Sequence, residues 1–343
     1  MSPSKTYRFH FLLLVCILFV CFVVNISLGS VAISFSDTLK TLFGLKIDNQ
    51  SWEYIIWNYR VPKAFTAVLA GAGLALSGLL MQTLFRNPLA GPFVLGISSG
   101  ASLGAAILIM GITIFSGVLS ATFINDASLA IASSLGSFLV LFLVIGVATR
   151  VKDTMALLII GLMFGSITTA VVSVLSYFTD SEKLQQYVFW TFGSVGGLSW
   201  PQLGILSAMI LVGILLSIGS IKSLNGYLLG ENYAQSLGVN LRTSRYLIII
   251  ATGILAGSIT AFAGPIAFIG LAVPHLTRQI FDTTDHKILV PAVLIYGSCI
   301  LLLCDIIAQL PGQAAVLPIN AITSIIGAPV VIWLLVRKRK MIF

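Results

Sequence analysis

The feature that most limits the fold of this chain is a series of apolar runs, each about as long as a bilayer is thick. A helix needs about 20 apolar residues to cross the hydrocarbon core of a membrane. Runs of that length recur along all 343 residues. We expect ten spanning helices, near residues 9–29, 64–83, 93–112, 127–148, 154–177, 201–220, 246–263, 265–281, 288–308 and 318–336.

The composition agrees with a membrane protein. Only 9% of the residues are charged and 58% are hydrophobic, and the mean hydropathy is +1.05. A soluble domain carries about 25% charged residues, which it needs to cover its surface. A chain this poor in charge must face lipid over most of its surface. We therefore expect a single all-α integral membrane domain over residues 1–343.

The first and eighth apolar runs differ from the others. Lys5 and Arg8 precede the first run, as in a signal peptide, but the apolar part of a signal peptide has only about 7–15 residues. This run is longer and lacks a clear cleavage site, so we expect a spanning helix with its N-terminus inside. The eighth run begins at Gly264-Pro265 and contains Pro274, which predicts a bent or partial span.

The basic residues are unevenly distributed in this topology. Ten spans place both termini on one side of the membrane, and 14 of the 19 Lys and Arg residues then lie on that side. Cytoplasmic segments of membrane proteins collect Lys and Arg, so we expect both termini in the cytoplasm. The same bias accounts for the net charge of +8 without nucleic-acid binding.

The stretch from Arg60 to Gly104 has the character of a transport path. Its apolar parts are rich in small residues, which let helix backbones approach closely in lipid. It is interrupted at residues 86–92 (RNPLAGP), and irregular backbone at membrane depth is tolerated only against protein or water. Gly91-Pro92 and Gly264-Pro265 each break an apolar stretch, one in each half, as inverted repeats of transporters do.

The long inner loop, residues 221–245, is a candidate contact for another protein. It is polar enough to lie in water, and residues 231–237 are expected to form a short helix that ends at Gly238. Apolar residues on such an exposed helix suit a partner protein. They equally suit a loop that packs on its own bundle, and the sequence leaves both interpretations open.

Three charged residues stand out at the outer side. Arg60 and Lys63 precede a helix, against the charge bias, and suit an acidic partner surface or an anionic substrate. The alternative is that their stems lie in lipid while their charged ends reach water. Asp305 lies in an apolar run near the outer end of its helix; it is a candidate for a proton relay or for a structural hydrogen bond.

Neither a metal nor a cofactor is expected. His275 and Arg278 lie on one helix face, but no second His or Cys stands at metal-ligand spacing, so we expect structural polar contacts near the inner surface. The cysteines form no CxxC pattern and lie in apolar runs, as buried thiols do. They are Cys16, Cys21, Cys299 and Cys304.

The sequence does not indicate an enzyme. A Walker A loop needs Gly-Lys before Ser or Thr, and no lysine of this chain follows a glycine. GxSxG and HExxH patterns are also lacking. If ATP drives this protein, another chain must hydrolyse it.

Six stretches together resemble the permease subunits of bacterial ABC importers of the FecCD type, which serve iron–siderophore complexes, haem and vitamin B12. The resemblance covers most of residues 55–337, in family order. The stretches are RVPK at 60–63, LSGLLMQTLFRNPLAGPFVLGISSGASLG at 76–104, LGENYAQSLGV at 229–239, AGPIAFIGLAVPHLTR at 263–278, TDHKILVP at 284–291 and LPINAITSIIGAPVVIWLL at 317–335.

This resemblance implies a homodimer of ten-helix subunits of the type II importer architecture in the bacterial inner membrane. Cytoplasmic ATP-binding subunits and a periplasmic or lipid-anchored substrate-binding protein are the implied partners. By position, Arg60 and Lys63 match the outer motif that meets acidic residues of the binding protein. Asn87 and Leu89 match a cytoplasmic gate, and Asp153 and Thr154 match a second inner gate loop. The match to the ATPase-coupling segment covers Gly230, Glu231, Ala234, Leu237, Gly238 and Val239.

The chain departs from the family pattern at three places. Lys63 stands where arginine is frequent, which keeps the charge but loses the planar fork. Gln309 stands where a third basic docking residue is frequent, so docking is expected to use fewer cations or different acidic residues on the partner. Pro318–Asn320 replaces the usual Pro-x-Gly, for which we have no explanation.

The resulting expectation is a permease subunit that imports a ferric siderophore or haem with ATP hydrolysed by its partner. A vitamin B12 importer shares all the motifs and is the alternative. An ion-coupled secondary transporter would need carboxylates inside the bundle, where Asp305 is the candidate. A membrane enzyme is a more distant alternative, because no paired acid–base or metal cluster is present in the sequence.

Overall fold

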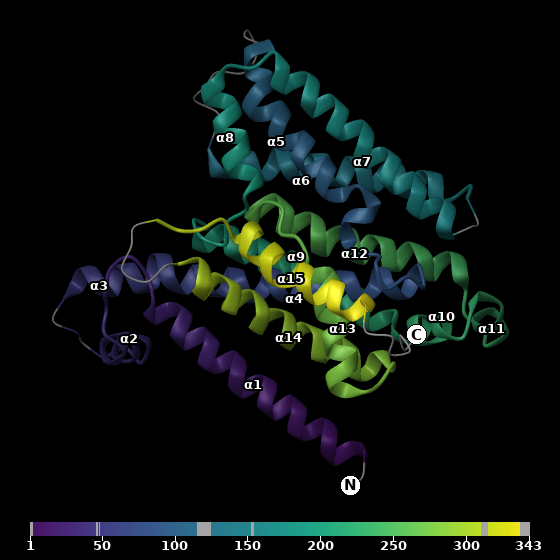
Figure 1. Cartoon of the computed structure of the whole chain (residues 1–343), viewed down its shortest axis with the longest axis horizontal. Helices are drawn as coiled ribbons and strands as arrows, with labels where there is room; N and C mark the ends of the chain where they lie inside the picture. The colour runs from purple at the N-terminus through teal and green to yellow at the C-terminus, as the bar shows by residue number, and fades with distance from the viewer. Residues whose placement is uncertain are drawn as a thin grey trace.

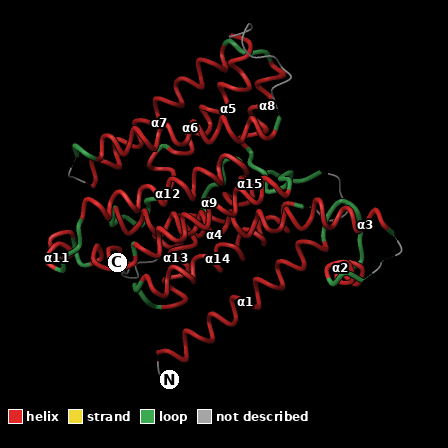
Figure 2. Tube along the Cα trace, turned by 180° about the vertical axis from the view of Figure 1, so that it is seen from behind, coloured by secondary structure: helices red, strands yellow, loops and turns green. Residues whose placement is uncertain are grey.

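The computed structural model describes residues 3–45, 47, 49–114, 125–151, 154–309 and 315–336. These residues form helices and loops and contain no strand (Figure 2). The helices are α1 Pro3–Ser27, α2 Phe35–Leu42, α3 Gln50–Ile55, the π-helix η1 Ile56–Arg60, α4 Val61–Leu84, the 3-10 helix η2 Pro92–Leu95, α5 Ile97–Ile114, α6 Asp126–Ala148, α7 Thr154–Tyr177, α8 Ser181–Thr191, α9 Trp200–Gly219, α10 Ile221–Leu228, α11 Glu231–Ser236, α12 Leu241–Ala263, α13 Ile269–Phe281, α14 His286–Ala308 and α15 Ile319–Val336.

Each of the ten predicted spans coincides with a helix, namely α1, α4, α5, α6, α7, α9, α12, α13, α14 and α15. Within the described residues, seven helical stretches are long and apolar enough to cross a membrane, while α5 and α15 contain shorter apolar segments. The eighth predicted span is the short helix α13, which has 13 residues and contains Pro274. This length is too short for a full crossing, in agreement with the expected bent or partial span.

The two ends of the bundle differ. The start of α1 and the last turn of α15 lie toward the end that carries α10 and α11, and α2 and α3 lie at the opposite end (Figure 1). We call the end with α10 and α11 the inner end and the end with α2 and α3 the outer end. Helix ends on one side agree with an even number of crossings, and the cytoplasmic location of that side stays a prediction.

Helix α4 is the centre of the bundle and is almost wholly buried among α9, α12, α13 and α14 (Figure 1). Small residues permit this position. Gly71 lies so close to the backbone of Gly297 in α14 that a Cβ atom on it would overlap the carbonyl of Gly297. Gly78 meets the carbonyl of Gly270 in α13 in the same way. Close backbone approach of this kind is how helices associate in lipid, where apolar burial gives no drive.

Helices α5, α6 and α7 form a second group beside this centre, joined to it through α12 (Figure 1). The predicted span at 93–112 begins later than expected, because Gly96 adopts φ 71° and separates η2 from α5. A Cβ atom at Gly96 would lie 2.9 Å from the Gly161 carbonyl oxygen of α7. The break therefore lets α5 and α7 pack closely.

Candidate functional sites

Arg60 is part of the fold at the outer end. It is the last residue of η1, and its side chain is only 7% exposed. Its Nη1 donates hydrogen bonds to the carbonyls of Ile26 at 2.9 Å and Ser27 at 2.8 Å, and its Nη2 donates to the carbonyl of Val31. The last carbonyls of a helix have no partner within the helix, so this guanidinium caps α1. Docking through Arg60 remains a prediction, beside this structural role.

Lys63 lies in a different environment from Arg60. Its Nζ forms an ion pair with Asp305 Oδ1 at 3.1 Å, which joins the start of α4 to the end of α14. Asp305 also accepts hydrogen bonds from Asn25 Nδ2 at 2.7 Å and Gln309 Nε2 at 2.8 Å. The structural hydrogen bond considered for Asp305 in the sequence is therefore present. Gln309, the residue at the position where the family resemblance led us to expect a basic side chain, thus serves as a hydrogen-bond donor to this carboxylate.

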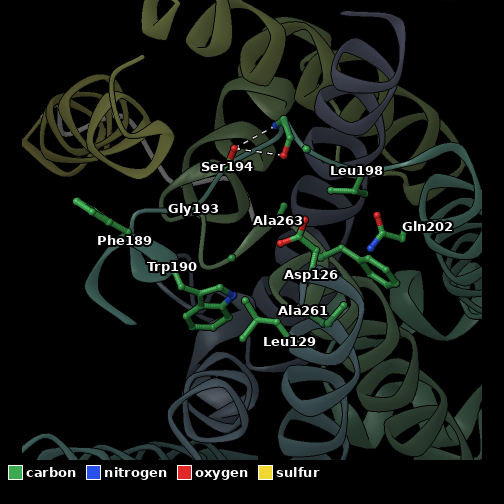
Figure 3. Close-up of a pocket in the computed structure, with 15 residues that line it drawn as sticks. Asp126, Leu129, Phe189, Trp190, Gly193, Ser194, Leu198, Gln202, Ala261 and Ala263 are labelled. Atoms are coloured by element: carbon green, nitrogen blue, oxygen red, sulfur yellow. Dashed lines mark hydrogen bonds between the residues drawn. The ribbon is translucent and has the colours of Figure 1, made fainter. Parts of the chain in front are cut away.

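A loop at residues 193–198 lies between two cavities of the outer end. One cavity has a volume of about 170 Å³ and is lined by Asp126, Trp190 and Gln202 together with this loop (Figure 3). The other has a volume of about 410 Å³ and contains Lys63 and Asp305. The loop is tied to the end of α12 by a hydrogen bond of 2.7 Å from the Ser194 backbone N–H to the Ala263 carbonyl.

The loop between α4 and η2 is held by its own turn and by α13. Asn87 Oδ1 accepts the backbone N–H of Leu89 at 2.9 Å, and the Leu89 side chain is exposed. His275 Nε2 lies 2.9 Å from the Pro88 carbonyl oxygen, to which it donates when protonated at that nitrogen. This contact fixes the loop that carries both predicted gate residues.

Two further bonds tie α4 to α13 near the same loop. Gln82 Nε2 donates to the Leu271 carbonyl at 3.1 Å, and Arg278 Nη1 donates to Gln82 Oε1 at 2.7 Å. His275 and Arg278 thus make the structural polar contacts expected from the sequence. Of the second predicted gate loop, Asp153 lies outside the described residues and Thr154 is the first residue of α7.

Helix α11 forms where the sequence places it, between Gly230 at φ 101° and Gly238 at φ 77°. Ala234 is fully buried and Val239 nearly so, whereas Leu237 is exposed. One face of the loop packs on its own bundle, as the second interpretation expects, and the other face is exposed, so the contact with a partner protein stays a prediction. The exposed apolar side chains of this face are Leu229, Tyr233 and Leu237.

Charged groups anchor α11 to its neighbours. Glu231 Oε1 lies 3.6 Å from Arg245 Nη2 in α12, and Arg245 Nη1 donates to the Val151 carbonyl at 3.1 Å. Tyr227 of α10 donates its hydroxyl to the Leu241 carbonyl at 3.1 Å, and burial raises the pKa of Tyr227 to about 12. This hydroxyl therefore stays protonated over the physiological pH range.

The predicted gate and coupling segments adjoin each other. Arg86, the residue before Asn87, lines a surface cavity of about 590 Å³ together with Gly230 and Glu231. A Cβ atom on Gly230 would lie 3.9 Å from Arg86 Nη1. The start of α11 and the loop between α4 and η2 therefore lie beside each other at the inner end.

A polar junction at the inner end has no counterpart in the sequence analysis. Asn225 of α10 donates to Asp285 Oδ1 at 2.7 Å and accepts the backbone N–H of His286 at 2.9 Å. The His286 ring contacts Asn225 Oδ1 through Nδ1 at 2.7 Å and Thr83 Oγ1 of α4 through Nε2 at 2.9 Å. Local sequence patterns give no signal for these contacts, because they join residues 61 and 203 positions apart.

Asp285 in this junction is charged at neutral pH. Burial raises its pKa, but hydrogen bonds from the backbone N–H of Lys287 and from Asn225 outweigh that effect, and its pKa lies below the usual carboxyl value. The carboxylate also caps α14 by accepting the Lys287 backbone N–H at 3.0 Å.

Comparison with known proteins places this geometry in a family. The model of the FecCD transport family matches residues 17–337. The vitamin B12 import system permease protein BtuC of Klebsiella pneumoniae subsp. pneumoniae is 40% identical over 287 residues, which are 84% of each chain. BtuC of Salmonella typhi is 38% identical over 288 residues, which are 84% of this chain and 85% of that relative.

Solved structures agree with this placement. A metal-chelate type ABC transporter in an inward-facing conformation matches with a TM-score of 0.82 and 29% identity, over 98% of this chain and all of that one. PsaBC from Streptococcus pneumoniae, solved with a Fab, matches with a TM-score of 0.55 and 14% identity over 90% of this chain and 98% of that one, and shares the fold alone. The chain belongs to the FecCD transport family and is a multi-pass permease subunit of a bacterial inner-membrane ABC importer, not itself an enzyme.

Proposed function

We propose that this chain forms the membrane path of a vitamin B12 importer. The observation that carries the proposal is the similarity to BtuC permeases over 84% of this chain. These relatives favour cobalamin, the alternative considered in the sequence analysis, over a ferric siderophore or haem. The metal-chelate type transporter keeps an iron chelate as the second candidate. Both cargoes are large polar complexes of a metal with an organic ligand.

We also propose that two copies of this chain face each other across the path. Helix α7 is the least buried of the seven membrane-length helices of the described residues. Its exposed face carries Ser166, Thr169 and Ser173, which line a groove of about 500 Å³ with Ser99 of α5. Each of the three α7 hydroxyls donates to a carbonyl one turn earlier in α7, and its remaining lone pairs are better matched by a second subunit and a water-filled path than by lipid.

Three segments would connect this path to its partners. The outer end with Arg60 and Lys63 would receive the substrate-binding protein. The turn with Asn87 and Leu89 would form the cytoplasmic gate, and Asp153 and Thr154 would contribute a second gate loop. The coupling segment would meet the ATPase through the exposed face of α11; it comprises Gly230, Glu231, Ala234, Leu237, Gly238 and Val239. The ion-coupled transporter and the membrane enzyme are not proposed, because family membership assigns the energy source to a partner ATPase.

Uptake into cells tests the cargo. Labelled cobalamin, a ferric siderophore and haem are compared in cells with and without this chain. The control carries the chain together with a partner ATPase that binds but does not hydrolyse ATP. Loss of cobalamin uptake alone, in the deletion and in the control, is the expected result. Loss of iron uptake instead would assign the second candidate, and uptake that is unchanged for all three would reject both.

A further inference from the structure

Lys63 and Asp305 form the charged wall of the larger outer cavity. The Asp305 side chain is 2% exposed and the Lys63 side chain 19% exposed, so the cation is the member of the pair that reaches the cavity. The other described residues that line this cavity carry no charge; they include Tyr59, Phe189 and Phe192 and the loop at residues 193–197. An anion that enters the cavity is therefore attracted by Lys63 and repelled by Asp305.

The Asp305 carboxylate keeps two hydrogen bonds when its ion pair with Lys63 is broken. Its Oδ2 accepts hydrogen bonds from Asn25 at 2.7 Å and from Gln309 at 2.8 Å, while Lys63 contacts Oδ1. Breaking a buried ion pair is costly when the remaining charge has no partner. Here two amide donors keep the carboxylate hydrogen-bonded. Lys63, by contrast, is a point charge on a flexible stem of four carbons, which can turn toward a new partner.

For Arg60, an exchange of its present partners for a carboxylate of the binding protein would cost more free energy. The hydrogen bonds of Arg60 go to the backbone carbonyls of Ile26 and Ser27 at the end of α1 and of Val31 in the loop that follows, and moving the guanidinium away would remove this donor from all three. Of the two cations in the proposed docking motif, Lys63 is the one whose partner is a side chain.

We propose, as an inference that rests on the proposed function, that Lys63 and Asp305 form a latch, by which we mean an ion pair that opens when the binding protein docks. On docking, an acidic side chain of the substrate-binding protein enters the cavity and replaces Asp305 as the partner of Lys63. Asp305 is then a positioning residue that competes with the incoming carboxylate. It holds Lys63 at the outer end in the free permease and lowers the affinity for the binding protein.

The competition predicts that docking becomes tighter when Asp305 is neutralised, which a purely structural role of Asp305 would not produce. Neutralising Asp305 releases Lys63 for the partner, so the Asp305→Asn importer should bind the binding protein more tightly. We expect the Kd to fall about threefold, which corresponds to the interaction energy of a partly exposed ion pair. Lys63→Gln should bind the binding protein more weakly. The double variant should bind like Lys63→Gln alone, because the released cation is missing. A carboxylate that merely stabilises the fold would instead weaken docking when neutralised.

The experiment measures the affinity of the purified binding protein for the full importer, with its ATPase, in lipid nanodiscs. Wild type, Asp305→Asn, Lys63→Gln and the double variant are compared at two salt concentrations. Asp37→Asn is the matched control, because it removes a carboxylate that pairs with Lys40 at 3.4 Å on the exposed outer helix α2. Its affinity is expected to equal that of wild type.

Each outcome has one meaning. Tighter docking of Asp305→Asn that disappears with Lys63→Gln supports the latch, and unchanged or weaker docking of a folded Asp305→Asn overturns it. If Asp305→Asn does not fold, Gln309→Lys offers Asp305 a competing cation, and the same gain that depends on Lys63 is expected. A wild-type importer that binds no binding protein would contradict the proposed function instead of the latch.

Discussion

The side chains of Asn225 and His286 are locked together at the inner end of the bundle. The amide oxygen of Asn225 lies 2.7 Å from His286 Nδ1 and also accepts the backbone N–H of His286 at 2.9 Å. Because that oxygen can only accept, Nδ1 carries the proton, and Nε2 lies 2.9 Å from Thr83 Oγ1. One amide thus joins α10, which leads into the proposed coupling segment, to α14 and through it to α4.

We predict that Asn225→Ala impairs the coupling between ATP hydrolysis and transport. The substitution removes the link from α10 to α14 and leaves polar groups of Asp285 and His286 without their partner. Cargo transported per ATP hydrolysed should fall about fivefold or more, the usual range of a coupling free energy. Proteoliposomes with the whole importer provide the measurement.

Ser223→Ala is the matched control for that prediction. It removes a hydroxyl from the same helix, where Ser223 accepts one hydrogen bond from Ser244 at 2.8 Å. Transport per ATP should stay near the wild-type value. An Asn225→Ala importer with the wild-type ratio would remove the junction from the coupling path.

Arg60→Lys should destabilise the protein although the charge is kept. An ammonium group cannot reach three carbonyls at once as the guanidinium fork does. The expected loss is about 1–3 kcal/mol, the cost of leaving buried acceptors without donors. Thermal unfolding in detergent measures it. Lys40→Met, at an exposed position of the same end, should leave the unfolding temperature unchanged; equal curves for both variants would contradict the capping role.

Gly71→Ala should prevent normal packing of the bundle. The added methyl group would overlap the Gly297 carbonyl, which is backbone and cannot move aside without displacing α14. We expect a loss of about 3 kcal/mol or more, at the upper end of overpacking effects. Gly204→Ala is the control, because a Cβ atom at Gly204 in α9 meets nothing within 4 Å. It should be equal to wild type or more stable by up to about 1 kcal/mol. Yields of folded protein and unfolding temperatures separate the two variants.

Leu237→Asp should weaken the contact with the ATPase while the subunit stays folded. Leu237 is 52% exposed at the end of α11. In the proposed complex the ATPase surface packs against this apolar side chain, and a carboxylate in its place would have to be desolvated. We expect ATP hydrolysis stimulated by the binding protein to fall about tenfold, as for a central interface residue worth more than 1 kcal/mol. Gln235→Asp, exposed on the same helix, should have a smaller effect. A Leu237→Asp importer with full stimulation would reject the coupling assignment.

The long apolar helices and the short helix α11 could be predicted because their signals are local. A run of about 20 apolar residues demands a membrane helix wherever it occurs. A glycine after a short polar run likewise marks a helix end, as Gly238 does for α11. The spacing of His275 and Arg278 predicted a shared face of α13 with polar contacts, but their partners Pro88 and Gln82 were not predicted.

The environments of the outer cations could not be predicted in this way. Whether Arg60 faces solvent depends on where the end of α1 lies, and that end is more than 30 residues away in sequence. The pairing of Lys63 with Asp305 joins the start of α4 to the end of α14. Such contacts depend on the tertiary arrangement of helices, which residue spacing within one helix does not contain.

The two glycine contacts of α4 have a mechanical consequence. Gly71 and Gly78 touch the backbones of α14 and α13 at two heights, so neither neighbour can slide along α4 without a collision between main-chain atoms. The three helices should therefore move as one rigid body, relative to which the other helices of the subunit shift. Rotation or tilting that opens and closes a path must then occur where α4, α13 and α14 meet the other helices, by hinge or shear at those boundaries.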